Sequence, residues 1–105
     1  MKTFDATIQH VVTKHIDPER CLVFLFGSRA GDGISAPASD YDVGLYQGTR
    51  IPFRVLASIQ DELEAYPIPV DVDLVDFSTV TETFKRLALQ HVKIWNQPKN
   101  GSNLI

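Results

Sequence analysis

Four aspartates in two short segments are the residues of this chain best suited to chemistry. Asp40 and Asp42 are separated by one residue, and so are Asp71 and Asp73. On a β-strand, residues two apart project from the same face, so each pair directs its carboxylates to one place. Two carboxylates about 4 Å apart repel by roughly 4 kcal/mol at an effective dielectric near 20, and a cation between them offsets this. The spacing predicts a cation site, and a solvated strand surface is the alternative.

The ligand type indicates which cation and which chemistry. Oxygen ligands favour a hard ion, Mg²⁺ or Mn²⁺, over zinc. Two metal ions held by three aspartates can stabilise the attacking and leaving oxygens of an in-line displacement, which gives a third carboxylate beside Asp40 and Asp42 a clear use. It can also accept the proton of the attacking hydroxyl. Asp71 and Asp73 share one strand face, so this reasoning leaves open which of them is the third.

A second candidate is the Gly27-Ser28 step, which directly follows the apolar run Cys21–Phe26. Glycine lets the backbone turn sharply and approach a ligand closely. The Ser28 hydroxyl and the N–H groups after it can face a phosphate. Arg29 follows at once and is the arginine best placed for the same phosphate. A plain turn at the end of a strand is the alternative interpretation.

The strands that must position these residues are marked by apolar or alternating segments. Strands are predicted at Cys21–Phe26, Asp40–Tyr46, Val70–Val75 and Val92–Trp95. The first is apolar without interruption, which is typical of a strand buried on both faces.

Helices are predicted between these strands from apolar positions at helical spacing. The first covers about residues 4–15, and the second begins at Pro52. A capping box, Thr79-x-x-Glu82, predicts the start of the third. The expected inward residues are Phe53, Leu56, Ile59 and Leu63 of the second helix and Phe84, Leu87 and Ala88 of the third. The alternation predicts an α+β (α/β) fold with a small mixed sheet flanked by helices.

Composition excludes several classes of protein. The 105 residues fit one domain, with a core at about 3–96 and a mobile tail at 97–105. A net charge of −3 argues against direct nucleic-acid binding, which usually needs a basic surface. No run approaches the ~18 apolar residues of a membrane span, and a cytoplasmic protein is expected. Cys21 is the only cysteine, so neither an internal disulfide nor a cysteine-based zinc site can form.

Taken in order, these motifs resemble a known family. Strand, Gly-Ser, loop, Asp-x-Asp, helix and a second aspartate-bearing strand, from Leu22 to Trp95, resemble the DNA polymerase β-like nucleotidyltransferase superfamily. The compact size resembles its minimal branch, the MNT domains. Minimal members place ten residues between the serine and the first aspartate, where this chain has eleven, and many carry a basic residue where this chain has Gly31 and Asp32.

The resemblance implies a role for each matching residue. Gly27 and Ser28 would bind the triphosphate. Asp40 and Asp42 would bind metal and act in catalysis. Asp73, within a hydrophobic–Asp–hydrophobic strand, would be the third carboxylate, with Asp71 as the competing choice.

The resemblance also implies an activity and a partner. It implies Mg²⁺- or Mn²⁺-dependent transfer of AMP from ATP to a hydroxyl. Minimal members commonly pair with a helical HEPN-type protein in toxin–antitoxin modules and can act as the antitoxin by attaching AMP to a tyrosine of the toxin, so a hetero-oligomer is expected. Two alternatives remain: a non-catalytic binding module that neutralises or scaffolds a partner, and a small-molecule nucleotidyltransferase completed by a helical subunit.

Overall fold

The computed structural model describes residues 4–30, 39–99 and 104. Its elements are α1 (Asp5–His15), β1 (Leu22–Phe26), the 3₁₀ turn η1 (Gly27–Arg29), β2 (Tyr41–Tyr46), α2 (Phe53–Leu63), β3 (Val72–Asp76), α3 (Glu82–Ala88) and β4 (Lys93–Asn96). The predicted alternation of helix and strand is confirmed, and strand ends differ from the predicted ones by at most two residues. No helix within the described ranges is long and apolar enough to cross a membrane.

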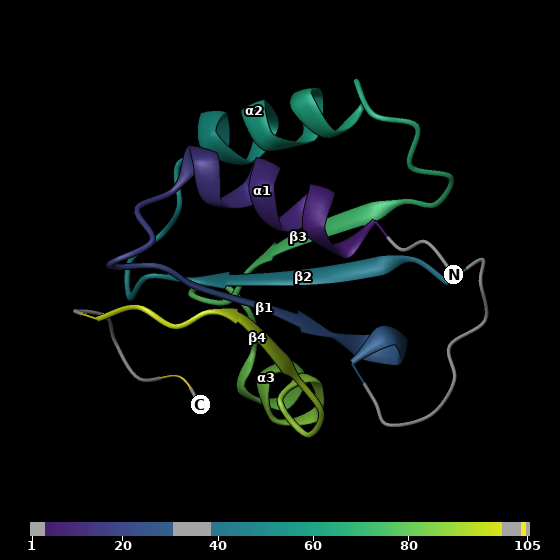
Figure 1. Ribbon diagram of the computed structural model, residues 1–105. Coiled ribbons are helices and arrows are strands. Elements are labelled where there is room, and N and C mark those ends of the chain that lie inside the picture. The colour runs from purple at the N-terminus through teal and green to yellow at the C-terminus, as the bar shows by residue number, and fades with distance from the viewer. Residues whose placement is uncertain (1–3, 31–38, 100–103, 105) are drawn as a thin grey trace.

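The four strands form one mixed sheet in the order β3-β2-β1-β4. β2 and β3 are parallel, whereas β1 is antiparallel to both β2 and β4. Parallel neighbours need a crossover connection, and α2 supplies it between β2 and β3. Helices α1 and α2 lie on one face of the sheet and α3 on the other (Figure 1). All five residues of β1 are buried for this reason, as its apolar run predicts.

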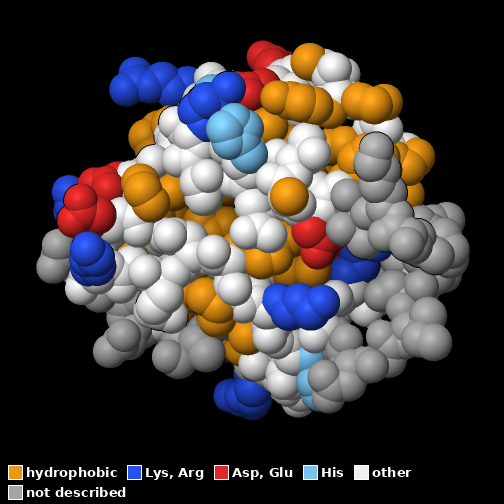
Figure 2. Space-filling view, viewed as in Figure 1, with side chains coloured by type: hydrophobic (Ala, Val, Ile, Leu, Met, Phe, Trp, Pro, Cys, Tyr) orange, Lys and Arg blue, Asp and Glu red, His pale blue; other side chains and the backbone are white. Residues whose placement is uncertain are grey.

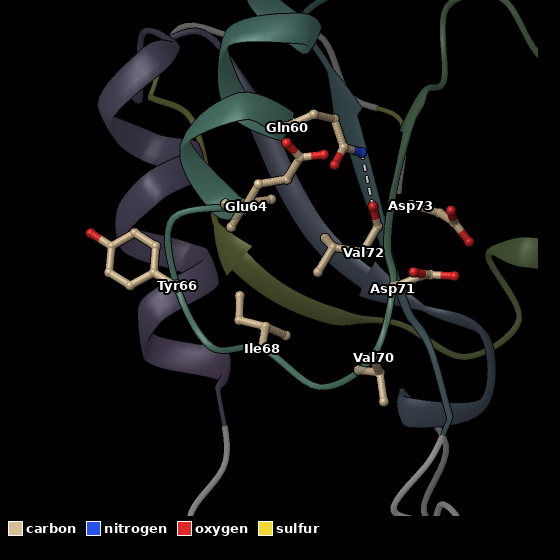
Figure 3. A pocket seen from close by; sticks show the side chains of 9 residues that line it. Gln60, Glu64, Tyr66, Ile68, Val70, Asp71, Val72 and Asp73 are labelled. Carbon is tan, nitrogen blue, oxygen red and sulfur yellow. Dashed lines mark hydrogen bonds between the residues drawn. The ribbon is translucent and has the colours of Figure 1, made fainter.

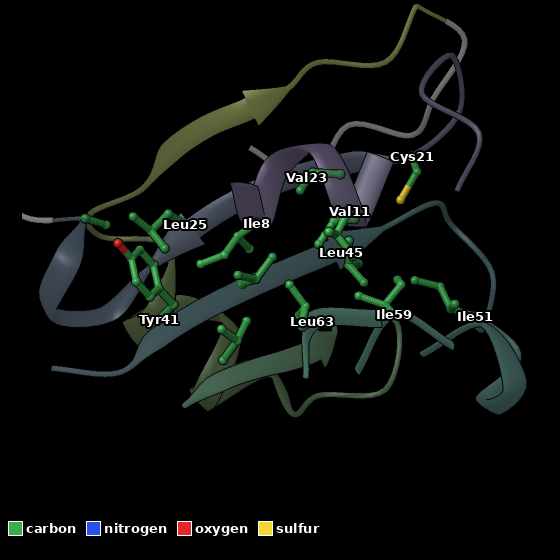
Figure 4. Close-up of a cluster of buried hydrophobic side chains, with 14 residues drawn as sticks. Ile8, Val11, Cys21, Val23, Leu25, Tyr41, Leu45, Ile51, Ile59 and Leu63 are labelled. Carbon is green, nitrogen blue, oxygen red and sulfur yellow. The ribbon is translucent and has the colours of Figure 1, made fainter. Parts of the chain in front are cut away.

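Two apolar clusters hold the layers together. The larger lies between the sheet and the α1–α2 layer and includes Ile8, Val23, Leu45 and Ile59 (Figure 4). The smaller lies on the other face, where Phe24, Phe26 and Phe77 pack edge-on to one another or tilted. Successive residues of β1 alternate between the two clusters, as the two-residue period of a strand requires. One face of the sheet is therefore covered by two helices, and the other by α3 together with residues that flank it and Leu104.

The predicted capping box at Thr79 is wrong. Helix α3 begins at Glu82, and its cap is Thr81, whose side chain accepts a hydrogen bond of 3.1 Å from the Phe84 N–H. The Thr79 hydroxyl instead donates to the Asp76 carbonyl at 2.8 Å. The turn that ends β3 uses Thr79, so the helix starts at the next threonine.

Three residues predicted to face inward are exposed. Phe53 is 82% exposed and Leu87 is 63% exposed, while Phe84 is 40% exposed and touches Phe26 and Phe77 with its ring. Phe53 is the first residue of α2, whose buried residues are Ile59 and Leu63, and it borders an open hollow beside Leu74 of β3. Helix α3 has seven residues and covers too little of the sheet to bury its whole apolar stripe.

Asp76 is a buried carboxylate at the end of β3, and we expect its removal to destabilise the fold. It accepts hydrogen bonds from the Ile51 N–H at 2.8 Å and from the N–H and hydroxyl of Ser78 at 2.9 and 2.8 Å. Asp76→Ala leaves the buried Ile51 N–H without its acceptor, which costs about 2–4 kcal/mol of unfolding free energy. Urea unfolding measures this, with Ser78→Ala as the milder control. A loss equal to that of the control would contradict the structural role.

Candidate active site

The parallel pairing of β2 and β3 brings Asp42 and Asp73 together. They are direct partners in the strand register, so their side chains project from the same face of the sheet on neighbouring strands. Asp40 lies just before β2 and two residues before Asp42, so its side chain projects from the same face of the sheet as that of Asp42. Asp71 lies just before β3, where its carbonyl accepts a hydrogen bond of 3.0 Å from the Tyr41 N–H. In Figure 3 the carboxylates of Asp71 and Asp73 both point away from α2.

Asp42 carries the electrostatic signature of a carboxylate cluster. The pKa of its carboxyl group is raised above the ordinary value, first by partial burial and then by the negative charges of Asp73 and Asp40. Burial and like charge both disfavour the ionised form. The groups that raise this pKa are the two aspartates predicted to share a metal with Asp42, and Asp71 is not among them. The geometry therefore favours Asp73 over Asp71 as the third carboxylate.

Gly27 brings the backbone against the Asp42 carboxylate. Its φ of +75° lies in the left-handed region that glycine adopts readily. A Cβ atom at this position would lie 2.3 Å from Asp42 Oδ2, so any side chain here would require the Asp42 carboxylate or the turn to move. Ser28 follows within η1 and is exposed. The structure thus places the Gly-Ser step and Asp42 next to each other, as the sequence motif requires.

Arg29 contacts the segment that leads into β2. Its Nε donates a hydrogen bond of 2.8 Å to the Ser39 carbonyl, and its Cζ lies 4.1 Å from the centre of the Tyr41 ring. Tyr41 precedes Asp42 on the strand and faces the opposite side of the sheet, where its hydroxyl donates to Asp5 at 2.8 Å. Arg29 therefore ties the turn after β1 to the start of β2. A contact with phosphate remains a prediction.

Sequence reasoning missed this link, although an aromatic residue between two aspartates, with an arginine after the preceding strand, is a detectable signal. The expectations for Gly31, Asp32 and most of the eleven-residue loop lie outside the described residues.

The carboxylates fit a hard metal ion by donor type and by charge. As their side chains stand, no three Asp, Glu, His or Cys side chains within the described ranges are gathered so as to hold one. Asp42 is fixed against Gly27, whereas Asp40 and Asp73 are exposed, and no packing opposes a change of rotamer. The charges of Asp73 and Asp40 nevertheless act on Asp42, so the three carboxylates would be the ones to hold the ion.

The raised pKa of Asp42 predicts how metal binding depends on pH. At mildly acidic pH this carboxyl group retains a proton that an ordinary aspartate has lost, and the proton competes with a metal ion. Mn²⁺ affinity should therefore fall as pH is lowered through the raised pKa. Between the ordinary and raised pKa values the native state binds more protons than the unfolded state, so the unfolding free energy of the metal-free protein falls as pH rises.

Calorimetric Mn²⁺ titrations from about pH 4, the ordinary range of an aspartate, up to neutral pH measure the first effect. Thermal melts across the same range measure the second. Asp42→Asn should flatten the Asp42-dependent part of both curves. An affinity that does not change with pH would contradict the coupling.

Comparison with known proteins shows which family the chain is similar to. Residues 6–99 match the model for "Polymerase beta, Nucleotidyltransferase". No protein of curated function matches the chain. One similar solved structure is a mutant of the toxin–antitoxin MntA-HpeT, with a TM-score of 0.66 and 18% identity over 89% of this chain and 73% of that chain.

Two other solved structures have the same fold. A toxin–antitoxin with AMP-PNP has a TM-score of 0.61 and 19% identity, covering 85% of this chain and 73% of that chain. A tri-AMPylated Shewanella oneidensis HEPN toxin in complex with MNT antitoxin has a TM-score of 0.58 and 18% identity, covering 88% and 72%. Because the family model spans nearly the whole described fold, the chain belongs to the polymerase beta nucleotidyltransferase family, and its fold is that of an MNT domain.

Proposed function

We propose that this protein transfers AMP from ATP to a hydroxyl group of a helical HEPN-type partner and thereby acts as its antitoxin. The observation that carries the proposal is the in-register pair Asp42 and Asp73, coupled with Asp40 and pressed against Gly27. Membership of the nucleotidyltransferase family supports the reaction class. Action in the cytoplasm is part of the same proposal.

Each residue has a role in the proposed transfer. Asp40, Asp42 and Asp73 would hold Mg²⁺ or Mn²⁺, which when bound neutralises the triphosphate and the charge that develops on the reacting oxygens. The acceptor oxygen attacks the α-phosphorus of ATP, the bond to the β-phosphate oxygen breaks, and pyrophosphate leaves. The proton of the acceptor hydroxyl passes to a carboxylate, for which Asp73 on the exposed edge strand is our candidate. Gly27 and Ser28, which lie next to Asp42, would contact the triphosphate.

Two of the similar structures support the partner and the nucleotide. One is an AMPylated HEPN toxin bound to an MNT antitoxin, and another contains AMP-PNP, an ATP analogue. With a protein as the acceptor, the hetero-oligomer is the complex of the enzyme with its own substrate.

The experiment is transfer of label from ATP marked at its α-phosphate to a HEPN-type partner protein. The proposal expects label on the partner only when a divalent metal is present. Release of labelled AMP, or of unlabelled pyrophosphate, without labelling of the partner would point to another acceptor. No turnover of ATP at all would contradict the proposal.

A non-catalytic binding module is the second candidate, favoured by the exposed apolar side chains and by the ungathered carboxylates. Calorimetry of ATP binding distinguishes the two functions. The enzyme should bind ATP more tightly with Mg²⁺, and Asp42→Asn should remove this gain. A module that only binds its partner should show neither effect.

A further inference from the structure

The side chain of Arg29 joins the two segments that make up the candidate site. Arg29 directly follows Ser28 at the end of the 3₁₀ turn η1. Its Nε donates to the Ser39 carbonyl at 2.8 Å, and its guanidinium group lies over the Tyr41 ring, with 4.1 Å between Cζ and the ring centre. Ser39 and Tyr41 are the two neighbours of Asp40 in the chain. One side chain thus holds the backbone immediately before this carboxylate and the side chain immediately after it.

Tyr41 gives Arg29 a rigid surface to pack on. Its ring belongs to the larger core cluster and is 2% exposed (Figure 4). At the start of α1, its hydroxyl donates to the Asp5 carboxylate at 2.8 Å and accepts from the Phe4 N–H at 3.3 Å. Since the ring is packed in the core and its hydroxyl is bonded on both sides, a shift of the ring would break these contacts. The guanidinium group is therefore held against a fixed part of the fold.

Asp40 is the carboxylate of the site that most needs such support. Asp42 and Asp73 lie within β2 and β3, where they are register partners. Asp40 precedes β2 and is exposed. The backbone N–H of Tyr41 is bonded to the segment before β3 at 3.0 Å, so sheet pairing holds the chain from Tyr41 onward. The hydrogen bond from Arg29 holds the chain on the other side of Asp40.

We propose that Arg29 is a positioning residue that holds the backbone of Asp40 in place for metal binding together with Asp42. This rests on the proposed function, in which Asp40, Asp42 and Asp73 hold the metal ion. Arg29 acts through the residues on both sides of Asp40 rather than through its positive charge. The planar guanidinium group and the donor at Nε, part-way along the side chain, are both needed, and lysine supplies neither.

Mn²⁺ binding distinguishes this role from an effect of charge. Arg29→Met keeps an apolar side chain but removes Nε and the positive charge. Loss of a positive charge near a cation site would by itself tighten Mn²⁺ binding, because like charges repel. Loss of positioning weakens it, since removal of a group that orients a metal ligand typically costs roughly 10–100-fold in affinity. Calorimetry without ATP or partner should therefore show Mn²⁺ binding weakened at least about tenfold in Arg29→Met.

Two variants serve as controls. Arg29→Lys keeps the positive charge and should weaken Mn²⁺ binding as much as Arg29→Met does. Arg54→Met removes the same charge from an exposed position at the start of α2 and should leave the affinity within about twofold. Figure 2 shows Lys and Arg side chains spread over the visible face rather than gathered in one patch, so Arg54 represents the loss of one surface charge. Tighter or unchanged Mn²⁺ binding by Arg29→Met, or normal binding by Arg29→Lys, would overturn the proposal.

Backbone dynamics test the cause of the weaker binding. In ¹⁵N relaxation measurements on the metal-free protein, the order parameter of the Asp40 amide should fall from about 0.85, typical of rigid backbone, to below about 0.6 in Arg29→Met. Asp42 lies within the sheet and should keep its value. Thermal melts of the same samples verify that the variant is folded. An unchanged order parameter at Asp40 would show that other contacts position it, and the proposal would be wrong.

Kinetics of AMP transfer separate failure of this role from failure of the proposed function. At saturating Mn²⁺, Arg29→Met should lower kcat at least about tenfold. A raised KM for ATP that Arg29→Lys largely restores would instead indicate a phosphate contact and overturn the positioning role. If the wild-type protein transfers AMP and Arg29→Met binds Mn²⁺ normally, the positioning role is wrong and the function stands. If it transfers no AMP, but Mn²⁺ binding falls in Arg29→Met and not in Arg54→Met, the function is wrong and the positioning role stands.

Discussion

Asp42→Asn is expected to abolish AMP transfer while making the metal-free protein more stable. The carboxylate is coupled to Asp73 and Asp40, so its loss removes a metal ligand and with it about 4 kcal/mol of transition-state stabilisation, roughly 10³-fold in rate. The same change relieves repulsion within the cluster, and the melting temperature should rise by a few degrees. A gain in stability with a loss of activity is the usual mark of a functional site.

Initial rates of AMP transfer and thermal melts of the metal-free protein measure the two effects. Asp71→Asn is the matched control, since Asp71 is also an exposed aspartate of the second acidic segment but is not among the groups that raise the pKa of Asp42. It should leave metal and ATP binding within about twofold, which is within the usual range for an exposed substitution. Asp73→Asn should behave like Asp42→Asn. The reverse order of effects for Asp71 and Asp73 would make Asp71 the third carboxylate.

Gly27→Ala is expected to inactivate the site by displacing Asp42. The added Cβ would lie 2.3 Å from Asp42 Oδ2, and the carboxylate is held on a buried strand, so either the turn or the side chain must move. The positive φ of Gly27 adds a backbone cost of about 1 kcal/mol. Transfer should fall by at least about 10²-fold, because a misplacement of roughly 1 Å is enough for such a loss.

Gly48→Ala separates backbone strain from the clash. Gly48 also has a positive φ, of 82°, but lies exposed in the connection between β2 and α2. Both alanine variants should lose similar amounts of unfolding free energy from strain, and Gly27→Ala alone should lose ATP affinity and activity. Full activity of Gly27→Ala would show that the Gly-Ser step is a turn and nothing more.

Local sequence patterns were sufficient to predict the strands of the sheet and the shared strand face of Asp40 and Asp42. The apolar run before Gly27 predicted a strand buried on both faces, and β1 is one, because helices cover both sides of the sheet. The Asp-x-Asp spacing predicted that Asp40 and Asp42 share a face, since alternation along a strand needs no tertiary information. The choice between Asp71 and Asp73 was different, because both lie on one face of one segment. It depends on the register between β2 and β3, which pairs Asp42 with Asp73.

The errors share a physical cause. Phe53 and Leu87 occupy helical positions that an isolated amphipathic pattern assigns to the core. Whether such positions are buried depends on how much of the helix is covered by its neighbours, which the pattern of one helix does not contain. Thr79 and Thr81 are both residues that commonly cap helices. The Thr79 hydroxyl is bonded to the Asp76 carbonyl in the turn after β3, so Thr81 caps the helix. The Arg29–Tyr41 contact joins segments whose pairing is set by the fold.

Intact mass measurement of the HEPN-type partner after incubation with this protein, ATP and Mg²⁺ tests the central claim most directly. The account predicts that the partner gains the mass of one or more AMP groups on a hydroxyl side chain. It also predicts that omitting Mg²⁺, or replacing the enzyme with its Asp42→Asn variant, prevents the gain. An unmodified partner in a complex that still forms would contradict it, as would modification that persists in the Asp42→Asn variant.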